Sequence, residues 1–390
     1  MIDKKKIGML SMAIATAVAA NADVILVDRP DVKLSATGLI MFDGALFTPK
    51  DDVFADGVSL PEVRLGAYGR FGNFEARIDL GYGMQKFRMK DVYMQYNPDA
   101  YNRLRLGYFI HHFGLNASTG NAAKPMIVEQ TPNAFFNANS RNLGLMYVYD
   151  RSAWFAAASL FASNRSLTEY ANTQGKISVG ALGRFLWRPF HESGKMVQIG
   201  ISPWYQTASH QRLEDGGVSR GNFSFACTYP TTVDNVELHE ADIPNAKGVF
   251  KLSPELLLSK GRCALESQYY YMNVTRDKGY VNYQAHGVYG MARFLILGDR
   301  QYTYSSANAG ITPSKPKTLE CVVGYSHTNA NCTGAGIYGG ISNDYSVTFT
   351  YNITKWMLAR LRYSYTDVRA NPDAPDRHVN IIQARVMFKF

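Results

Sequence analysis

Arginines spaced two residues apart recur along this sequence and are its strongest candidates for chemistry. Arg103 and Arg105 are separated by one residue, and so are Arg360 and Arg362. Successive side chains of a β-strand point to opposite faces, so residues spaced by two share a face. Arginine stays charged and presents several N–H donors, so a row of arginines can bind or steer anions. The arginines that fit this phase are Arg77, Arg103, Arg105, Arg360, Arg362 and Arg385.

Other chemistries find less support in the sequence. His111 and His112 suggest a metal, but neighbours on a strand point to opposite faces, and no carboxylate or cysteine follows at ligand spacing. Gly217-Val218-Ser219-Arg220-Gly221 has GxSxG spacing, but it falls in a predicted loop and not between a strand and a helix, so it gives no nucleophile signature. Basic residues are spread singly and not clustered, which disfavours nucleic acid as a partner. We therefore predict no catalytic residue, no metal, no cofactor and no nucleic-acid binding.

The four cysteines show neither a CxxC pair nor metal-site spacing. Cys263 and Cys321 fall on the apolar phase of alternating segments, where they act as small hydrophobic residues. Cys227 and Cys332 fall in predicted loops and are the pair that could form a disulfide. Whether they do so stays open at this point.

Composition and the N-terminus indicate an exported protein. The 390 residues carry a net charge of +9, with 19% charged and 13% aromatic residues. Lys4, Lys5 and Lys6 precede an apolar stretch over residues 7–20, and a small-x-small cleavage pattern ends at Ala22. We therefore predict a signal peptide over residues 1–22 and a single domain over residues 23–390. No later apolar run is long enough for a transmembrane helix.

The predicted domain consists of β-strands throughout. Residues 74–82 and 382–390 alternate apolar with charged, polar or small side chains, which gives a strand two unlike faces. A soluble β-sandwich would also alternate, but here the polar face is charged and aromatic residues recur at the segment ends, which favours lipid outside and water inside. We predict an all-β transmembrane antiparallel barrel of about sixteen strands. The predicted strands are 33–47, 60–69, 73–82, 89–96, 103–109, 142–149, 153–161, 177–187, 195–206, 247–258, 262–272, 282–296, 317–328, 343–351, 356–366 and 379–390.

The connections between these strands mostly alternate between short and long. Long ones cover residues 110–141 and 207–246, and tight ones lie at residues 70–72 and 150–152. Outer-membrane barrels have long loops outside the cell and short turns in the periplasm. We therefore expect residues 207–246 to be exposed outside and residues 150–152 to face the periplasm. The connection at residues 297–316 is long although it lies on the short-turn side.

Several segments, in the same order, resemble the phosphate-selective porin O and P family. They include Gly38-Leu39-Ile40-Met41-Phe42-Asp43-Gly44, Lys90-Asp91-Val92-Tyr93-Met94-Gln95-Tyr96 and Leu104-Arg105-Leu106-Gly107-Tyr108-Phe109. Later come Asn142-Leu143-Gly144-Leu145, Leu265-Glu266-Ser267-Gln268-Tyr269, residues 294–302 and Tyr363-Ser364-Tyr365. The resemblance implies a sixteen-stranded barrel in a Gram-negative outer membrane, trimeric, with an inward third loop and a lumen lined by Arg and Lys.

The resemblance also implies where solutes pass. It puts Arg64 near the constriction, and Lys124 falls on the third loop. The family has adjacent arginines where only Arg64 stands here, and Gln130 replaces an expected arginine. Carboxylates also fall near the lumen, so we expect a passive channel for small anionic solutes with weak anion preference. The exact solute, phosphate or polyphosphate included, stays open.

Two further expectations concern partners. The apolar outer face predicts outer-membrane lipids as partners. The terminal Phe390 resembles an assembly signal for the barrel-assembly machinery. An outer-membrane barrel enzyme, or an adhesin or receptor that uses its surface loops, is the alternative function.

Overall fold

The chain forms a closed antiparallel barrel of sixteen strands, as predicted. The computed structural model describes residues 24–49, 53–83, 86–119, 124–138, 140–163, 167, 175–305, 309–312, 314–372 and 375–390. The predicted signal peptide lies outside these residues. The described helices are α2 (Gly114–Ser118), α3 (Thr131–Phe135) and the short η2 (Thr333–Ala335). None of them is long and apolar enough to cross a membrane.

Each barrel strand corresponds to one predicted strand, with ends that differ by a few residues. The strands are β2 (Val32–Thr48), β3 (Gly57–Phe71), β4 (Phe74–Gly83), β5 (Lys86–Tyr96), β6 (Asn102–Ile110), β7 (Arg141–Arg151), β8 (Trp154–Ala162), β9 (Val179–Glu192), β10 (Lys195–Thr207), β13 (Ala246–Lys260), β14 (Cys263–Arg276), β15 (Tyr283–Leu297), β18 (Thr318–Cys332), β19 (Ile337–Asn352), β20 (Met357–Arg369) and β21 (Arg377–Lys389).

The barrel closes where β2 pairs with both β3 and β21. The β2–β21 ladder runs from Leu39 opposite Lys389 to Thr48 opposite Asn380. A short strand that sequence reasoning missed, β1 (Val24–Asp28), pairs with β2 next to the end of β21. Closure leaves no unpaired strand edge in the wall, which a membrane-spanning sheet requires.

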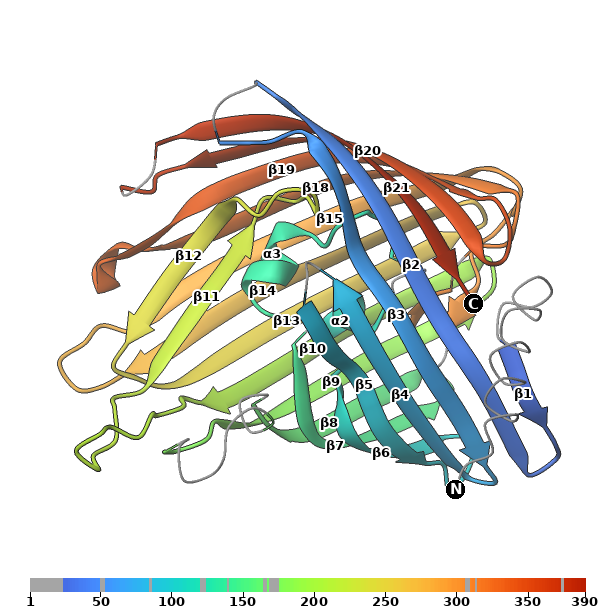
Figure 1. Cartoon of the computed structure of the whole chain (residues 1–390), viewed down its shortest axis with the longest axis horizontal. Helices are drawn as coiled ribbons and strands as arrows, with labels where there is room; N and C mark the ends of the chain where they lie inside the picture. Colours follow the sequence, from blue (N-terminus) through green and yellow to red (C-terminus); the bar gives the residue numbers. More distant parts are fainter. Residues whose placement is uncertain are drawn as a thin grey trace, which may run out of the picture.

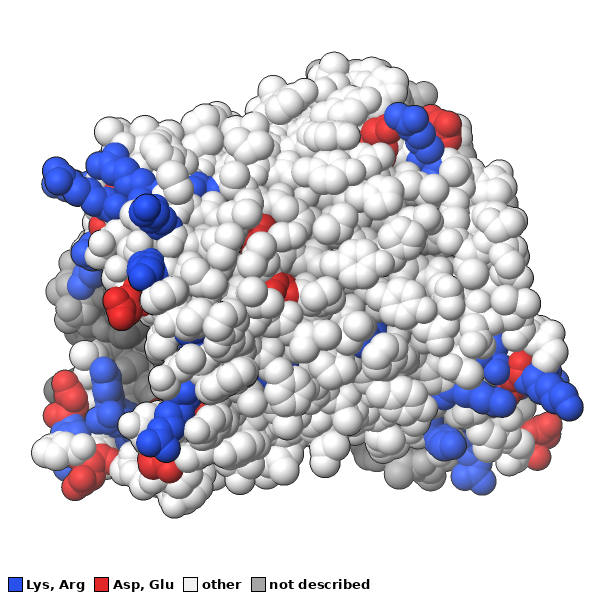
Figure 2. Space-filling model, turned by 180° about the vertical axis from the view of Figure 1, so that it is seen from behind, with Lys and Arg blue, Asp and Glu red and all other residues white. Residues whose placement is uncertain are grey.

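Apolar side chains cover the outer face of the wall. Leu106 is 61% exposed and Leu160 is 65% exposed, and both lie on the outward phase of their strands. Figure 2 shows a broad band almost without charged residues, with Lys, Arg, Asp and Glu gathered at its two ends. Such a band matches the hydrocarbon layer of a membrane, because charged side chains are costly there.

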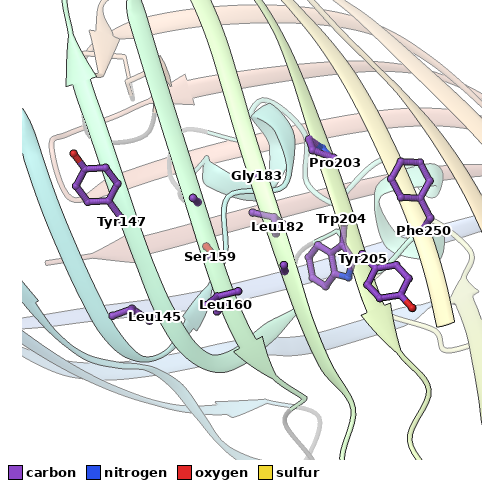
Figure 3. Close-up of a pocket in the computed structure, with 12 residues that line it drawn as sticks. Leu145, Tyr147, Ser159, Leu160, Leu182, Gly183, Pro203, Trp204, Tyr205 and Phe250 are labelled. Atoms are coloured by element: carbon purple, nitrogen blue, oxygen red, sulfur yellow. The ribbon is translucent and has the colours of Figure 1, made fainter. Parts of the chain in front are cut away.

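Small residues hollow this outer face over β8 and β9. Ala158, Ala181 and Gly183 form the floor of a furrow of about 520 Å³. Leu160, Tyr205 and other large side chains stand around it (Figure 3). The furrow lies on the lipid-facing surface, outside the channel.

The connections between strands segregate by length to the two ends of the barrel, which we call the loop end and the turn end. Strands β7 and β8 are joined by a two-residue turn at the turn end, as are β9 and β10 and also β13 and β14. Figure 1 shows β1 and the C-terminus at this turn end. The long connections over residues 111–140 and 208–245 leave from the loop end. Exceptions to this pattern are residues 298–317, which form a long connection at the turn end, as predicted, and β4 and β5, which are separated by only two residues at the loop end.

The segment predicted as an exposed loop over residues 207–246 is only partly exposed. Within it lie β11 (Asn222–Thr228) and β12 (Glu237–Pro244), which pair as an antiparallel hairpin. Leu238, Ala241 and Ile243 are buried, because the hairpin folds against the barrel interior. Sequence reasoning missed the hairpin, since its alternation is short and lies far from the strands it contacts.

The structure shows no disulfide between the four cysteines and no metal site at the adjacent histidines His111 and His112, within the described part of the chain. All four cysteines are free, so Cys227 and Cys332 form no disulfide here. His111 and His112 follow the end of β6 and are both buried. Among the described residues, no group of three potential ligands could hold a metal ion.

Candidate permeation pathway

Three segments fold into the barrel and fill much of its interior. The inner loop (residues 111–140) carries α2 and α3, and the hairpin loop (residues 208–245) carries β11 and β12. The turn-end insertion (residues 298–317) contains β16 (Tyr304–Ser305) and β17 (Gly310–Ile311) and enters from the opposite end. Figure 1 shows α2, α3 and the β11–β12 hairpin surrounded by barrel strands.

Buried arginines of the wall hold the inner loop in place. Arg360 donates to the carbonyl oxygens of Lys124 (2.6 Å) and Met126 (3.2 Å). Arg385 donates to the carbonyl oxygen of Ile127 (2.7 Å) while it forms a bidentate pair with Asp43. Both guanidinium groups therefore fix a loop backbone in place, and solvent reaches little of either side chain.

The hairpin loop is attached to the same region of the wall. Arg362 donates to the carbonyl oxygen of Pro230 (2.8 Å) and pairs with Asp344 (2.9 Å). Buried His239 contacts the carbonyl oxygen of Gly339 and the hydroxyl of Ser342, both at 2.7 Å. Polar groups of the hairpin are therefore satisfied by the strands that it covers.

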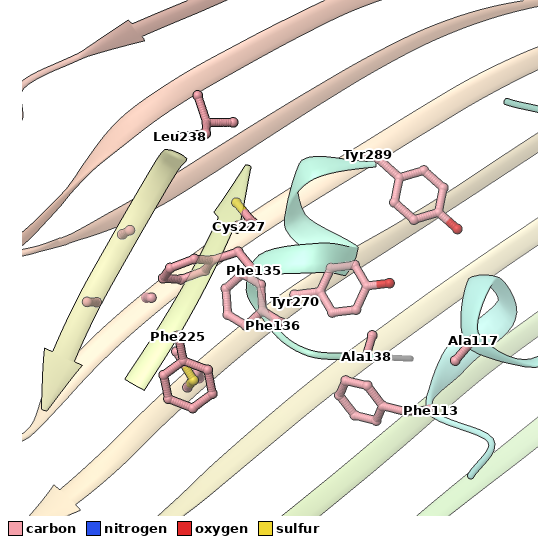
Figure 4. Close-up of a cluster of buried hydrophobic side chains, with 14 of the residues drawn as sticks. Phe113, Ala117, Phe135, Phe136, Ala138, Phe225, Cys227, Leu238, Tyr270 and Tyr289 are labelled. Atoms are coloured by element: carbon pink, nitrogen blue, oxygen red, sulfur yellow. The ribbon is translucent and has the colours of Figure 1, made fainter. Parts of the chain in front are cut away.

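An apolar cluster joins the inner loop to the hairpin loop. Phe135 at the end of α3 and the following Phe136 lie between Phe225 of β11 and Tyr270 of the wall (Figure 4). The rings of Phe136 and Tyr270 stack with their centres 5.5 Å apart. This interior cluster, and not the lipid-facing surface, serves as the core of the molecule.

The turn-end insertion meets the inner loop inside the barrel. Leu115 of α2 and Ile311 of the insertion belong to one buried cluster. Fully buried Arg184 links these parts, since it pairs with Glu255 (2.7 and 2.9 Å) and donates to Ser118 (2.8 Å) and to the carbonyl oxygen of Ala309 (3.3 Å). The interior beside β9 to β15 is therefore packed.

The wall formed by β3 to β7 keeps partly exposed charged side chains, and we call it the open wall. The side chain of Arg77 is 33% exposed, the largest value among the paired cations of this wall. Six cations of these strands are partly exposed, as are the carboxylates apart from the buried Asp79, whereas Arg70, Lys86, Arg88 and Arg151 are exposed. The six partly exposed cations are Arg64, Arg77, Lys90, Arg103, Arg105 and Arg141, and the carboxylates are Glu62, Glu75, Asp79, Asp91 and Asp150.

Most of these cations are paired with carboxylates of the same wall. Arg64 pairs with Glu62 at 2.5 Å, and Lys90 reaches the same carboxylate at 3.4 Å. Arg77 pairs with Asp79 at 2.9 Å. Two further pairs lie near the ends of the wall, namely Arg103 with Asp150 (3.1 Å) and Arg141 with Asp91 (3.0 Å).

Arg105 differs from the other cations of the open wall. It donates to the amide oxygen of Gln95 (2.7 and 2.9 Å), and its guanidinium lies 4.1 Å from the ring centre of Tyr93. Among the described residues no carboxylate lies within ion-pair distance of it. Neither an amide nor a ring neutralises its charge.

The predicted site residues divide into three groups. Arg64, Arg77, Arg103 and Arg105 lie on the open wall, and Lys124 lies on the inner loop, where it pairs with Glu129. The remaining three also point inward, but they are buried behind the inserted loops. These three are Arg360, Arg362 and Arg385.

Sequence reasoning missed Lys90 and Arg141 on the open wall and Arg184, Arg293 and Lys251 beneath the loops. Lys90 and Asp91 both have partners inside the barrel, although neighbours on a regular strand point apart. An irregularity in the β4–β5 pairing between Ile78 and Leu80 accounts for this, since one extra residue on β5 forms a bulge. Alternation in the sequence does not reveal such a bulge.

Comparisons with known proteins agree with this geometry. The family model of the phosphate-selective porins O and P matches residues 42–390. A loop L8 deletion mutant of OmpT, an outer-membrane protein of Vibrio cholerae, has a similar fold, with a TM-score of 0.60 and 10% identity over 92% of this chain and 100% of that chain.

Two other solved structures also share the fold. The trimer form of in-vitro folded Vibrio cholerae OmpT has a TM-score of 0.58 and 10% identity, covering 92% of this chain and 100% of that one. Pseudomonas putida OprB has a TM-score of 0.52 and 10% identity, covering 92% and 94%. No curated protein matches this chain.

Proposed function

The chain belongs to the phosphate-selective porin O and P family, and we propose that it is a passive diffusion channel for small solutes with a weak preference for anions. It is an outer-membrane β-barrel protein of a Gram-negative bacterium. We place the solute path along the open wall, because the opposite side of the interior is packed with inserted loops.

The charges of the open wall support a weak preference. The six partly exposed cations face five carboxylates, and the ion pairs between them cancel much of the field that an anion meets. Arg105, which has no carboxylate partner among the described residues, and the more exposed Arg77 supply the remaining attraction. The proposed anion preference depends chiefly on one observation: among the described residues, no carboxylate pairs with Arg105.

A tight phosphate site receives less support. Binding a multivalent anion requires several donors that converge on it, because its dehydration is costly. Gln130, at the position where the family has an arginine, is buried and donates to the sulfur of Met291 at 3.4 Å. Arg64 is engaged by Glu62 and Asp79. We therefore favour a general anion preference over phosphate or polyphosphate specificity.

The reversal potential across a planar bilayer with a KCl gradient tests this proposal. We expect the reversal potential of the wild-type channel to lie slightly toward the equilibrium potential of chloride. Replacing both Arg77 and Arg105 by Gln should reduce that preference, because it removes the most exposed paired cation of the wall and the cation that has no carboxylate partner among the described residues. Arg151→Gln, at an exposed turn, is the matched control and should change little.

An unchanged reversal potential in the double variant would locate the filter elsewhere. Saturation of the chloride current by micromolar phosphate would instead establish a tight phosphate site. A protein that forms no channel at all would overturn the porin function and leave the enzyme or receptor alternative.

We further propose that the mature protein covers residues 23–390 after removal of residues 1–22, and that it assembles as a homotrimer. The trimer form of the OmpT structure supports the second proposal by analogy of fold. Outer-membrane lipids, small anionic solutes and the barrel-assembly machinery are its proposed partners.

A further inference from the structure

A pocket of about 250 Å³ lies at the loop end of the barrel, between the inner loop, β10, β11 and β13. Its lining includes Arg141, which is also part of the open wall, so the pocket adjoins the proposed solute path. Its volume suits one six-membered ring with its substituents. Nothing in the proposed diffusion function requires a pocket here.

Lys251 places a buried amine in the lining of this pocket. The residue is 3% exposed, and its Nζ donates to the carbonyl oxygen of Phe136 at 2.7 Å. Nζ also lies 5.0 Å from the ring centre of Trp204 and 5.1 Å from that of Phe225. In the described part of the chain, no carboxylate lies within ion-pair distance of Nζ. A buried ammonium without a counter-charge is costly, and an anion bound in the pocket would supply that charge.

A second donor in the pocket lacks a partner. Asn142 is 6% exposed, and its Nδ2 has no hydrogen-bond partner in the described structure. Buried amide groups are nearly always paired, so this orphaned N–H is an available site for an acceptor. Arg141, which also lines the pocket, is already paired with Asp91 at 3.0 Å, and the described residues that line the pocket include no Asp or Glu. The polar side of the pocket thus favours an anionic group.

The other residues that line the pocket favour a ligand with a hydroxylated ring. Trp204, Phe223 and Phe225 form an apolar side, and the amide of Gln206 and the hydroxyl of Ser224 lie beside them. Specific small-molecule sites combine apolar and aromatic walls with a few placed polar groups in this way. A simple inorganic ion would leave the aromatic side unused.

We propose that this pocket binds a carboxylate-bearing solute of monosaccharide size, such as a sugar acid, next to the open wall. The carboxylate accepts hydrogen bonds from Lys251 Nζ and Asn142 Nδ2, and the ring lies against the aromatic side chains. This inference rests on the proposed channel function and names a substrate class for it.

Block of single-channel current by D-glucuronate tests the proposal with the full-length protein in planar bilayers. We expect saturable interruptions of the wild-type current. Lys251→Met should raise the half-blocking concentration at least tenfold. Lys247→Met is the matched control, because Lys247 lies on the same strand, is 58% exposed and pairs with Asp277 outside the pocket. Its half-blocking concentration should equal that of the wild type.

A second variant separates binding from loop anchoring, since Lys251 also holds Phe136. Asn142→Asp leaves the Lys251 contact intact and places a negative charge in a side chain of similar shape, and it should also raise the half-blocking concentration at least tenfold. If Lys251→Met forms no channels, this variant still decides the matter. Equal block in wild type and Asn142→Asp would overturn the proposal.

Neutral and small probes test the ligand class. D-glucose and acetate should each block at least tenfold more weakly than D-glucuronate, because one lacks the carboxylate and the other lacks the ring. Equal block by either would overturn the assigned class. A conducting channel that D-glucuronate does not block would refute this inference alone, whereas absence of conductance would refute the channel function.

Discussion

The last residue of the chain completes the wall of the barrel. The backbone of Phe390 exchanges two hydrogen bonds with Gly38, at 2.7 and 3.0 Å. Its ring covers the face of Gly38 so closely that a Cβ atom there would lie 2.3 Å from the ring. Glycine at position 38 and an aromatic residue at position 390 therefore fit each other, at the place where the first and last barrel strands meet.

Replacing Phe390 by Ala should lower the amount of assembled barrel in cells. Loss of this partly buried ring removes about 1–3 kcal/mol of packing, and it also removes the proposed recognition signal. Phe390→Trp keeps an aromatic ring and should assemble nearly as well as the wild type. The amount of assembled barrel is measured on gels as the band whose migration changes on heating. Equal amounts in the wild type and the Phe390→Ala variant would argue against both the packing role and the recognition role of Phe390.

At the scale of elements, the docking of the hairpin loop depends on a buried neutral histidine. Burial lowers the pKa of His239 from 6.5 to about 4, with a smaller contribution from the neighbouring His327. Both ring nitrogens contact the wall, at Gly339 and Ser342, and the ring packs against Phe135, with ring centres 5.7 Å apart. Docking is therefore favoured fully above pH 6.5, and this contribution is lost as the pH falls from 6.5 to 4.

Hydrogen–deuterium exchange should reveal this loss in residues 222–244. We expect faster exchange near pH 4 than at pH 7.5, after correction for intrinsic rates, because undocking gains on the order of 3 kcal/mol from protonation. His239→Gln keeps a donor and an acceptor but does not titrate, so its hairpin should show a much flatter pH dependence. Equal pH dependence in both proteins would show that another group causes the effect. The next candidate is His111 of the inner loop, because burial lowers its pKa to about 4 as well.

At the scale of the whole molecule, the segregation of connection lengths predicts the orientation in the membrane. Porin-like barrels direct long loops outward and short turns to the periplasm. The loop end of this barrel therefore faces outside, and Glu214 of the hairpin loop and Ser152 of a tight turn lie at opposite ends. Both residues are exposed.

Single cysteines at these two positions test the orientation in intact cells, in a variant in which the four native cysteines are replaced by Ser. A membrane-impermeant maleimide should label Glu214→Cys and leave Ser152→Cys unmodified until the outer membrane is opened. Labelling of Ser152→Cys alone in intact cells would show that the orientation is the reverse of the predicted one. The pocket beside Lys251 would then open toward the periplasm.

The sequence by itself determined the wall of this protein. Alternation with a period of two located all sixteen barrel strands and the face to which residues such as Arg105 and Arg362 point, because that period follows directly from strand geometry. Connection lengths also identified the unusual segment at residues 298–317. The short hairpin of β11 and β12 escaped this reasoning, since its pairing and burial depend on contacts with distant strands.

Only the tertiary structure decided what the inward-facing residues do. Alternation places Arg105 and Arg362 alike on the inward face of their strands. In the structure, however, Arg105 lies partly exposed on the open wall, and Arg362 is buried beneath the hairpin loop. The interior of a barrel both lines the channel and binds the loops that enter it. Which of the two a residue does depends on where residues 111–140, 208–245 and 298–317 settle, and those positions are fixed by long-range contacts that no local pattern encodes.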